Sequence, residues 1–377
     1  MELPAALRHA VDRALEGIPL AGLTGAAEML SRRYRSETRD GRFHVDDDLA
    51  ARAYLATRLP ATYAAIRAAL AMVEERQPDF TPAHLLDLGA GPGTALWAAL
   101  DCWPRLTAAV LLEGSAAIRK QGEALIDQAL PAAASGQTSI AWAVADLTRL
   151  GAEDCGTAPS DVASSGASSS GHEICGKARG DLVTLCYVLD ELAPAARSRL
   201  IDWAWSRCDG LLLIVEPGTP AGWHRILTAR DQLIAAGAQI VAPCPHERPC
   251  PLLPPALPAS DAAREHLAAA DNWCHFSRRV ARSRLHRLVK QADVPWEDEK
   301  FIFIAAMDPA LPPAADARDN AARIIAPVRQ NGGQLQLQLC DAAGRYRDLR
   351  LSKRDGHAYK QARRRDWGYS IDIADTL

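Results

Sequence analysis

The apolar positions in the first fifth of the chain follow a helical period. They recur about every 3.6 residues near the start, at Leu3, Leu7, Val11 and Leu15. Residues 49–73 are rich in alanine, which is a strong helix former. Residues 1–79 are therefore predicted to be helical, and the basic residues at 31–35 are predicted to be a solvated helix end.

A different pattern begins at residue 84, where short apolar runs alternate with helical segments such as 194–208 and 223–236. The runs have the length of buried strands and cover residues 84–88, 109–113, 140–145, 182–189 and 211–216. Strands that alternate with helices in this way form a parallel sheet with helices on both faces. A Ser-, Gly- and Ala-rich tract at 151–180 interrupts the alternation and is predicted to be a flexible surface insertion.

The pattern changes again after Ile240. A segment rich in proline and cysteine spans 243–258, and residues 276–290 form a strongly basic helix candidate. Residues 301–306 are predicted to be another strand. Beyond Ile324 apolar and polar residues alternate, which indicates antiparallel strands with apolar positions at Leu335, Leu337 and Leu339.

These changes of pattern predict four parts. Residues 1–79 form a helical N-terminal extension, and residues 80–242 form an α/β nucleotide-binding domain. Residues 243–290 form a segment that is rich in cysteine and basic residues. Residues 291–377 hold the last sheet strands and a basic, β-rich C-terminal part.

Composition and charge exclude few functions. Apolar residues make up 48% of the chain, charged residues 24%, and the net charge is −3, as in an ordinary globular protein. No apolar run reaches the roughly 18–20 residues of a membrane helix, and the start has no secretory signal pattern. We therefore expect a cytoplasmic protein without a membrane partner. Its nine cysteines would stay reduced, and clustered ones would bind metal.

A glycine turn follows the first predicted strand, with the sequence Gly89–Ala90–Gly91–Pro92–Gly93. Glycines let the backbone bend sharply and lie against a ligand, and the following helix presents free N–H groups. The dinucleotide fingerprint is G-x-G-x-x-G, whereas G-x-G-x-G is the variant that class I methyltransferases use to bind S-adenosylmethionine. An NAD-dependent oxidoreductase is the alternative, but the third glycine stands one residue early and no hydride-transfer residues are apparent.

Three acidic residues extend this candidate cofactor site. Glu113 ends the second strand, where a carboxylate can accept hydrogen bonds from both ribose hydroxyls. Asp146 ends the third strand, a suitable place to receive the adenine amino group. Asp87, in the first strand, would face the amino-acid end of the cofactor.

Four cysteines follow the predicted sheet. Cys244 and Cys250 are each followed by proline, which stiffens their loops, while Cys274 and Cys340 stand in later segments. Four thiolates suit zinc or an iron–sulfur cluster, and the spacing does not decide between them. His246 or His275 could replace Cys340 in a zinc site.

A catalytic role for these cysteines is the alternative. RNA 5-methylcytosine enzymes use a cysteine after proline as a nucleophile, and Pro243–Cys244 has that local pattern. Ligation accounts for more of the cysteines and is preferred.

Two basic blocks are candidates for nucleic-acid contacts. The first lies in the candidate helix and contains Arg278, Arg279, Arg282, Arg284, Arg287 and Lys290. The second spans 345–365 and ends in Arg363, Arg364 and Arg365, with Tyr346 and Tyr359 available to stack on bases. An ion-paired, solvated surface is the alternative for either block alone.

Several of these segments together resemble one family. The Cys–Pro block from Cys244 to Pro251, the run Trp273–Cys274–His275–Phe276 and the closing Asp366–Trp367–Gly368 resemble the small-ribosomal-subunit assembly methyltransferases of mitochondria and bacteria. The resemblance extends from about Tyr34 to Gly368.

The resemblance implies a protein that binds S-adenosylmethionine and associates with the small ribosomal subunit or its rRNA. It also implies a 4Fe–4S cluster, with zinc as the alternative, held by Cys244, Cys250, Cys274 and Cys340. The expected fold class is α/β, with the Rossmann-like sheet of class I S-adenosylmethionine-dependent methyltransferases, a helical N-terminal extension and a Cys-rich metal-binding insertion. Off the ribosome we expect a monomer.

The catalytic residues are less well defined. Amino-group methyltransferases place an Asn/Asp–Pro–Pro–aromatic motif after the fourth strand, and this chain has Tyr187, Asp190 and Glu191 there. Tyr187 could stack on a base, and either acid could accept a proton. Two functions therefore stay open: an enzyme that methylates rRNA, and a catalytically silent assembly factor whose metal site and basic surfaces carry the function. A methyltransferase acting on a protein is a third reading.

Overall fold

The computed structural model describes residues 1–40, 42–130, 138–151, 176–253, 273–311 and 321–373. The helices are α1 (Ala5–Leu15), α2 (Leu20–Arg35), α3 (Asp48–Thr57), α4 (Leu59–Arg76), α5 (Thr94–Cys102), α6 (Ala116–Ala129), α9 (Pro194–Ser206), α10 (Pro220–Ala235), α12 (Arg284–Val289) and α13 (Gly356–Ala362), with the 3₁₀ turns η1 (Leu189–Glu191) and η2 (Lys353–Asp355). The strands are β1 (His84–Leu88), β2 (Ala108–Leu112), β3 (Ser139–Ala143), β4 (Gly180–Cys186), β5 (Cys208–Pro217), β6 (Gln239–Ala242), β7 (Phe276–Ala281), β8 (Trp296–Met307), β9 (Ala321–Ile324), β10 (Arg329–Asn331), β11 (Gln334–Asp341), β12 (Tyr346–Ser352) and β13 (Ser370–Asp372).

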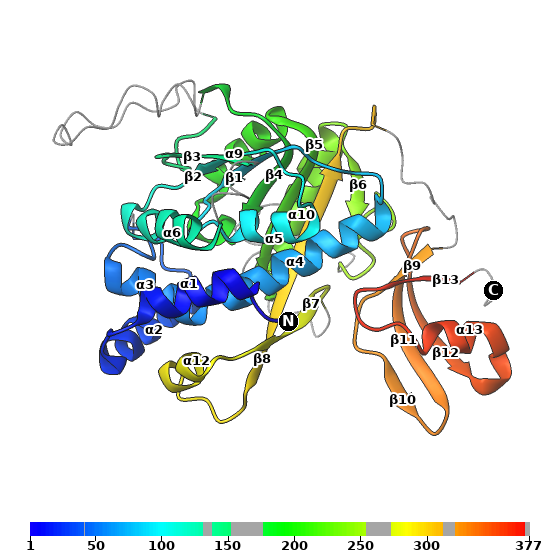
Figure 1. Ribbon diagram of the computed structural model, residues 1–377. Helices are drawn as coiled ribbons and strands as arrows, with labels where there is room; N and C mark the ends of the chain where they lie inside the picture. The colour runs from blue at the N-terminus through cyan, green and yellow to red at the C-terminus, as the bar shows by residue number, and fades with distance from the viewer. Residues whose placement is uncertain (41, 131–137, 152–175, 254–272, 312–320, 374–377) are drawn as a thin grey trace. The chain divides into compact units, whose positions relative to one another are not determined.

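The larger sheet has the strand order β3-β2-β1-β4-β5-β8-β6, with β7 paired to β8 (Figure 1). β1 pairs in parallel with β2 and β4, and β2 with β3. The order reverses between β1 and β4, so the loops after these two strands open at the switch point, where doubly wound folds bind ligands. The architecture is the α/β class I methyltransferase fold that the glycine turn predicts.

The sequence pattern finds most strands of this sheet and misjudges its last part. The predicted strands at 84–88, 109–113, 140–145, 182–189, 211–216 and 301–306 all overlap strands of the structure. The parallel pairing predicted for the alternating strands is present between β1, β2, β3 and β4, whereas β6 pairs with β8 in antiparallel register. The tract at 151–180 lies mostly outside the described residues.

The predicted basic helix at 276–290 is also wrong. Its first half is strand β7, which has Phe276 and Val280 buried, and only its second half is helical, as α12. Ser283 separates the two, since its hydroxyl accepts a hydrogen bond from the His286 amide and caps α12. Pairing of β7 with β8 overrides the helix propensity of the arginines.

The described chain packs into two compact units. Unit 1 comprises Met1–Leu70, Thr81–Leu212 and Arg278–Glu299, and unit 2 comprises Ala71–Phe80, Leu213–Ser277 and Lys300–Leu377. These units are defined by packing, whereas the four predicted parts are defined by sequence pattern, so that division stays a prediction.

In unit 1 the predicted N-terminal extension is helical. α1 and α3 pack against α6, and α2 packs against α3 (Figure 1). The short helix α12 contacts both α2 and α3. The side chains that α1 buries include Leu7, Val11 and Leu15, three of the four apolar positions in the predicted period.

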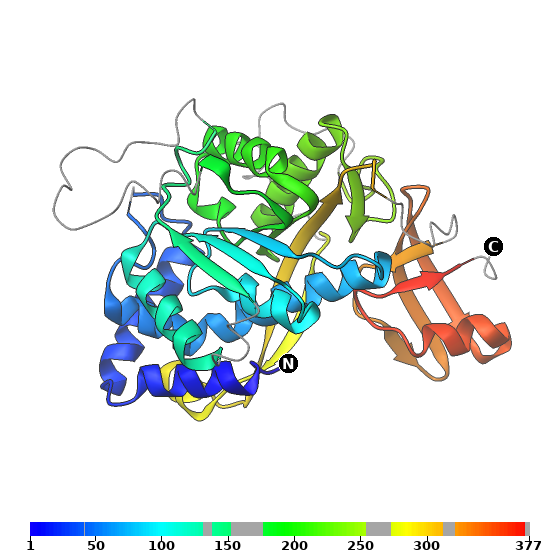
Figure 2. The ribbon, with the colours of Figure 1, turned by 45° about the horizontal axis from the view of Figure 1, so that its top comes forward.

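In unit 2 a second sheet has the order β10-β11-β9-β13, with β12 paired to β11. Figure 2 shows this part of the chain in orange and red. The alternating residues Leu335, Leu337 and Leu339 are buried in its core, as the pattern predicts. Tyr359 of α13 lies in the same core, so its ring is not available to stack on a base. Among the described residues, no helix is long and apolar enough to span a bilayer.

Candidate functional site

The glycine turn after β1 has a backbone that only glycine adopts readily. Gly89, Gly91 and Gly93 all have positive φ, of 72°, 55° and 80°. A Cβ on Gly89 would come within 2.5 Å of the Val188 side chain, whereas a Cβ on Gly91 would meet nothing within 4 Å. The turn is therefore packed on one side and leaves the Gly91 backbone open to a ligand.

Glu113 fixes this turn. One carboxylate oxygen accepts the Gly91 amide at 2.8 Å, and the other accepts the Ser115 amide at 2.7 Å. Burial raises the pKa of Glu113, and these amide donors oppose that shift. Each oxygen has a second lone pair, so the carboxylate can hold the turn and still accept ribose hydroxyls.

Asp87 lies beneath the turn and is almost fully buried. One oxygen accepts the Thr184 hydroxyl at 2.7 Å, and the other finds no hydrogen-bond partner among the described residues. Burial raises the pKa of Asp87 to about 7, and the negative charge of Glu113 adds to the shift. A buried carboxyl with an unused oxygen favours a cationic ligand group nearby, such as an ammonium.

A cavity of about 560 Å³ opens beside the turn, within the usual size range of small-molecule sites. We call it the nucleotide cavity. Its sheet side includes Gly89, Gly91, Glu113 and Asp146. Asp146 is half-exposed and accepts the Thr148 hydroxyl at 2.6 Å.

The opposite wall comes from the N-terminal extension, which sequence analysis did not connect with the site. Phe43 and His44 line the cavity, and His44 stacks on Tyr34 with ring centroids 4.7 Å apart. A Cβ on Gly114 would stand 2.7 Å from the Phe43 ring, so this close approach requires glycine. The signal was in the sequence, since Gly114 directly follows Glu113, but the partner ring lies 71 positions earlier and no local pattern joins them.

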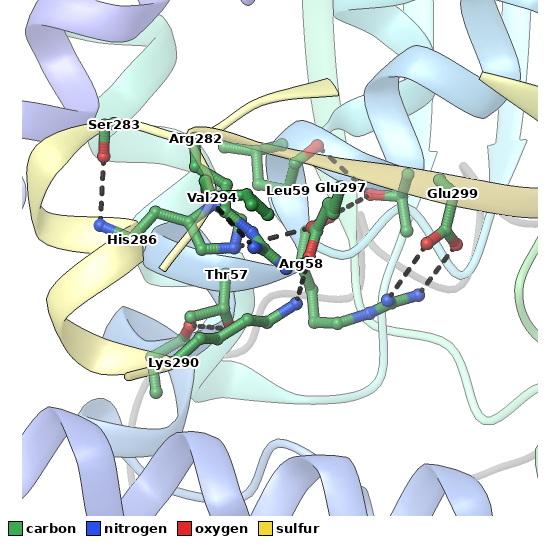
Figure 3. A network of polar contacts seen from close by, with 12 residues as sticks. Thr57, Arg58, Leu59, Arg282, Ser283, His286, Lys290, Val294, Glu297 and Glu299 are labelled. Carbon is green, nitrogen blue, oxygen red and sulfur yellow. Dashed lines mark hydrogen bonds and ion pairs between the residues drawn. The ribbon is translucent and has the colours of Figure 1, made fainter. Parts of the chain in front are cut away.

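Tyr187, which follows β4, has a φ of 60°, a strained conformation for this residue. Its hydroxyl donates to Glu299 at 3.1 Å, and the Arg58 guanidinium binds the same carboxylate at 3.2 Å. Figure 3 shows the Arg58–Glu299 pair. Burial raises the pKa of Tyr187 well above its ordinary value, so its hydroxyl is a neutral donor at physiological pH.

The three catalytic candidates differ in access to the cavity. Tyr187 and Glu191 line it. Asp190 is buried and its backbone carbonyl accepts the Arg39 guanidinium at 3.0 Å. All three assignments stay predictions.

The four predicted ligand cysteines meet in unit 2. Cys244, Cys250, Cys274 and Cys340 all line one narrow cavity of about 30 Å³, which we call the thiol cavity. Burial raises the pKa of each thiol, that of Cys250 to about 11. His246 also lines the cavity, with its Nε2 3.2 Å from the Cys340 sulfur.

The metal-binding insertion itself is not supported by this geometry. Within the described ranges, no group of three or more His, Cys, Asp or Glu side chains could hold a metal ion. The other candidate ligand, His275, stacks on Trp273 and hydrogen-bonds its carbonyl at 3.1 Å. The structure thus gathers four sulfurs around one cavity without arranging a ligand set.

Two buried arginines organise the loops around the thiol cavity. Arg230 donates to the carbonyls of His246 and Arg248 at 2.9 and 2.8 Å. Arg323 donates to the carbonyls of Pro243 and Gly368 at 3.0 and 2.7 Å and pairs with Glu75 at 3.2 Å. These bonds fix the backbone around Cys244.

The first basic block is largely ion-paired. Arg279 binds Asp298 at 2.9 Å, and Arg282 and Lys290 share Glu297 at 3.0 and 2.8 Å (Figure 3). The remaining members of the block are Arg278, Arg284 and Arg287. In unit 2, Arg363, Arg364 and Arg365 are exposed at the end of α13. The nucleic-acid role of both sets stays a prediction.

Comparison with known proteins gives one family. Residues 48–372 match the family described as mitochondrial small ribosomal subunit Rsm22. A human relative, the mitochondrial ribosome assembly protein METTL17, is 29% identical over 212 residues, covering 53% of this chain and 41% of that protein. The mitochondrial Rsm22-cox11 tandem protein 2 of Schizosaccharomyces pombe is 24% identical over 354 residues, covering 84% of this chain and 42% of that protein. The chain thus spans about two fifths of the length of these relatives.

Among solved structures, magnesium protoporphyrin IX methyltransferase from Synechocystis is 12% identical and covers 74% of this chain and 90% of its own, with a TM-score of 0.37. A putative RNA methyltransferase from Pyrococcus horikoshii is 11% identical, covers 64% of this chain and 84% of its own, and has a TM-score of 0.34. TM-scores this low do not support a function for the chain.

The expected cytoplasmic location is wrong on these findings. The matching family and both relatives are named as mitochondrial, which points to the mitochondrion. The expectation failed because the charge and hydropathy of a folded chain carry little information about its compartment.

Proposed function

The chain belongs to the Rsm22 family of mitochondrial small ribosomal subunit proteins, and from this premise we propose that it binds S-adenosylmethionine and acts on the small ribosomal subunit, in its assembly or by methylating its rRNA. The names of the relatives support the ribosomal role, since the human relative is a ribosome assembly protein. The main observation in support of the cofactor proposal is the Gly91 backbone, which faces open space beside the nucleotide cavity and is held by Glu113.

The residues around the nucleotide cavity fit this cofactor. The free lone pairs of Glu113 suit ribose hydroxyls. Asp87 is buried and is not among the described residues that line the cavity, so contact between its unused oxygen and an ammonium group would require a local rearrangement. Asp146 suits the adenine amino group. When bound, the sulfonium donor supplies a methyl group to a nucleophile in line with the breaking bond.

Two side chains on the acceptor side of the cavity have different roles in this proposal. Tyr187 is a neutral hydroxyl tied to Glu299, and Glu191 is the carboxylate on the cavity wall that could take a proton. The alternative function, a catalytically silent assembly factor, keeps the cofactor pocket and lacks transfer.

Calorimetry with a matched pair of glycine variants tests the cofactor. Gly91 and Gly17 both have positive φ, 55° and 75°, and a Cβ on either would meet nothing within 4 Å. Alanine at each position carries a similar backbone strain of about 1–2 kcal/mol. We expect Gly91→Ala to weaken binding of S-adenosylmethionine and its demethylated product by tenfold or more, and Gly17→Ala to leave it within twofold. Absence of binding heat in the unaltered chain would refute the proposal.

Transfer is tested separately from binding. Purified small subunits from cells lacking the protein are incubated with the chain and methyl-labelled donor, and label in rRNA is measured. Label that disappears with Glu191→Gln, while donor binding persists, supports the enzyme. Restored subunit maturation by a Gly91→Ala chain, without label, supports the silent factor.

For the thiol cavity we propose a 4Fe–4S cluster held by Cys244, Cys250, Cys274 and Cys340, with zinc as the alternative. The support is the placement of four thiols on one cavity wall, which is the donor set of such clusters. Iron and sulfide near four per anaerobically purified chain would support the cluster, and one zinc would support the alternative. Cys102→Ala is the control, since that cysteine lies in α5 and does not line the thiol cavity.

A further inference from the structure

A second concave surface in unit 1 lies apart from the nucleotide cavity. It is a groove of about 580 Å³ between one side of α2 and the segment that runs from β7 through α12. Ser31, Arg32 and Arg35 line it from α2, and Arg282, Lys290 and Gln291 line it from the other side. We call it the basic groove. The two sides are adjacent in Figure 1, and α2 and α12 are in contact.

The cations of the basic groove are only partly neutralised. Glu297 binds both Arg282 and Lys290, so one carboxylate faces two cations and holds their side chains in place (Figure 3). The Arg32 side chain makes no hydrogen bond or ion pair with any residue that the structure describes. Within the described residues, the Arg35 guanidinium donates only to the carbonyl of Ser31, at 3.1 Å. Glu28 is the acidic residue among those that line the groove.

Gln291 adds a second observation. It directly follows Lys290, the C-cap of α12, and has a φ of 49°. Glycine is the usual residue at this position because it adopts positive φ without strain. The amide of this strained glutamine lies on the wall of the cationic groove, where it can donate a hydrogen bond to a bound group.

We propose that the basic groove binds the phosphate backbone of double-helical RNA, an inference that rests on the proposed ribosomal function. Arginine matches phosphate with two parallel hydrogen bonds, and the Ser31 hydroxyl and Gln291 amide add neutral donors. None of the described residues that line the groove is aromatic, so unpaired bases have nothing to stack on. Recognition by phosphates alone suits a regular duplex and is insensitive to sequence.

One side of the basic groove comes from residues 31–35, for which the sequence predicts a solvated helix end. The other side includes Arg282 and Lys290 of the first basic block, for which the sequence predicts nucleic-acid contacts. Residues 31–35 alone have the pattern of a solvated helix end. Packing of α12 on α2 places them opposite Arg282 and Lys290, and the combined field is stronger than that of either segment.

The test is fluorescence anisotropy of the full chain with a labelled RNA duplex of about 20 base pairs, close to the span of known double-stranded RNA binders. We expect Arg32→Gln/Arg35→Gln to weaken duplex binding at least tenfold. The slope of log affinity against log salt should fall by about two, one for each lost phosphate contact. The control is Arg105→Gln/Arg199→Gln, which removes the same charge from exposed arginines that do not line the groove and should change affinity less than twofold.

Gln291→Gly separates binding from stability. We expect it to raise the unfolding temperature, because it relieves the positive φ, and to weaken duplex binding about threefold. If Gln291 had only a structural role, Gln291→Gly would raise the unfolding temperature and leave duplex affinity unchanged. Tighter binding of single-stranded poly-U than of the duplex, or equal losses in the groove and control variants, would overturn the proposal.

Failure of this inference differs from failure of the proposed function. A chain that still binds S-adenosylmethionine and small subunits, while the groove variants bind duplex normally, disproves the groove alone. A chain that binds no small subunit and no RNA disproves the ribosomal role.

Discussion

The nucleotide cavity and the thiol cavity differ in how complete they are. The first has a volume of about 560 Å³ and a wall of glycine backbone held by Glu113. The second has about 30 Å³, and the four cysteines that line it, of which Cys340 is buried and the others are half-buried, do not form a ligand set. The nucleotide cavity has room for a small molecule, whereas the thiol cavity is too small to receive a ligand without rearrangement.

The difference follows from the groups that form each wall. Backbone amides and a carboxylate can satisfy one another before a ligand arrives, as Gly91 and Glu113 do. Thiolates repel each other and gain a partner only when a metal binds, so a metal site is normally completed by its metal. Preorganisation in unit 2 therefore lies in Arg230 and Arg323, which hold the loop backbone, rather than in the sulfurs.

The largest expected effect concerns these arginines. Arg323→Met removes the arginine that donates to the carbonyls of Pro243 and Gly368, and it leaves Glu75 only the more distant Arg365, at 4.0 Å, among its described ion-pair partners. We expect a loss of about 3–5 kcal/mol in the free energy of unfolding, measured by urea denaturation. Binding of S-adenosylmethionine should persist under native conditions, since the nucleotide cavity belongs to unit 1. The exposed Arg363→Met is the control and should cost less than about 0.5 kcal/mol.

An intermediate effect concerns Asp87. Its raised pKa of about 7 means that roughly half of the carboxyl groups are protonated at neutral pH. A cationic ligand favours the carboxylate, so affinity for S-adenosylmethionine should rise about tenfold from pH 6 to pH 8, with protons released on binding. Calorimetry across this range measures both quantities.

The control for this pH dependence is Asp87→Asn, which should bind more weakly and with little pH dependence. Glu113 and His44 also titrate near the cavity, so a profile unchanged by Asp87→Asn would assign the dependence to them instead. The fold favours the neutral form of Asp87, so its stability contribution decreases as pH rises from about 4 to 7. Asp87→Asn should therefore stabilise the ligand-free chain at pH 8.

The smallest expected effect concerns the wall from the N-terminal extension. Gly114→Ala would place a Cβ 2.7 Å from the Phe43 ring and 3.0 Å from the Ala145 carbonyl oxygen. We expect affinity for S-adenosylmethionine to fall about threefold to fivefold and stability to fall by about 1 kcal/mol. Phe43→Ala in the same chain should restore part of the stability, because the ring clash is removed. Unchanged affinity in both variants would show that the extension does not shape the pocket.

The sequence predicts the parts of this protein whose signal is local. The strand–turn–helix around Gly91 and the buried runs of β1 to β5 are readable because their pattern lies within a few residues. The basic segment at 276–290 was misread because pairing of β7 with β8, a contact between distant positions, overrides local propensity. The antiparallel β6 was missed for the same reason.

The residues of the candidate site divide in the same way, into those with a local sequence signal and those that only folding brings together. Glu113 and Asp146, which line the cavity, are found from their places at strand ends, whereas Asp87, predicted in the same way, does not line it. Phe43, His44 and Arg58 are not found in this way, because only the folded chain brings the extension to the cavity or to Tyr187. The sequence contexts and the family resemblance likewise predicted the four cysteines as a group, and only the structure shows that Arg230 and Arg323 organise the loops between them.

In this proposal Glu113 both holds the glycine turn and accepts ligand hydroxyls, which limits the substitutions that the position can accept during evolution. A carboxylate that anchors the glycine turn through Gly91 cannot be exchanged for a neutral side chain without loosening the turn, even in a lineage that no longer needs the ligand. Persistence of this acid among descendants is therefore poor proof of retained catalysis. Asp146 is bound to Thr148 and Arg149 rather than to the glycine turn, so its loss would be an earlier sign that the pocket is no longer used.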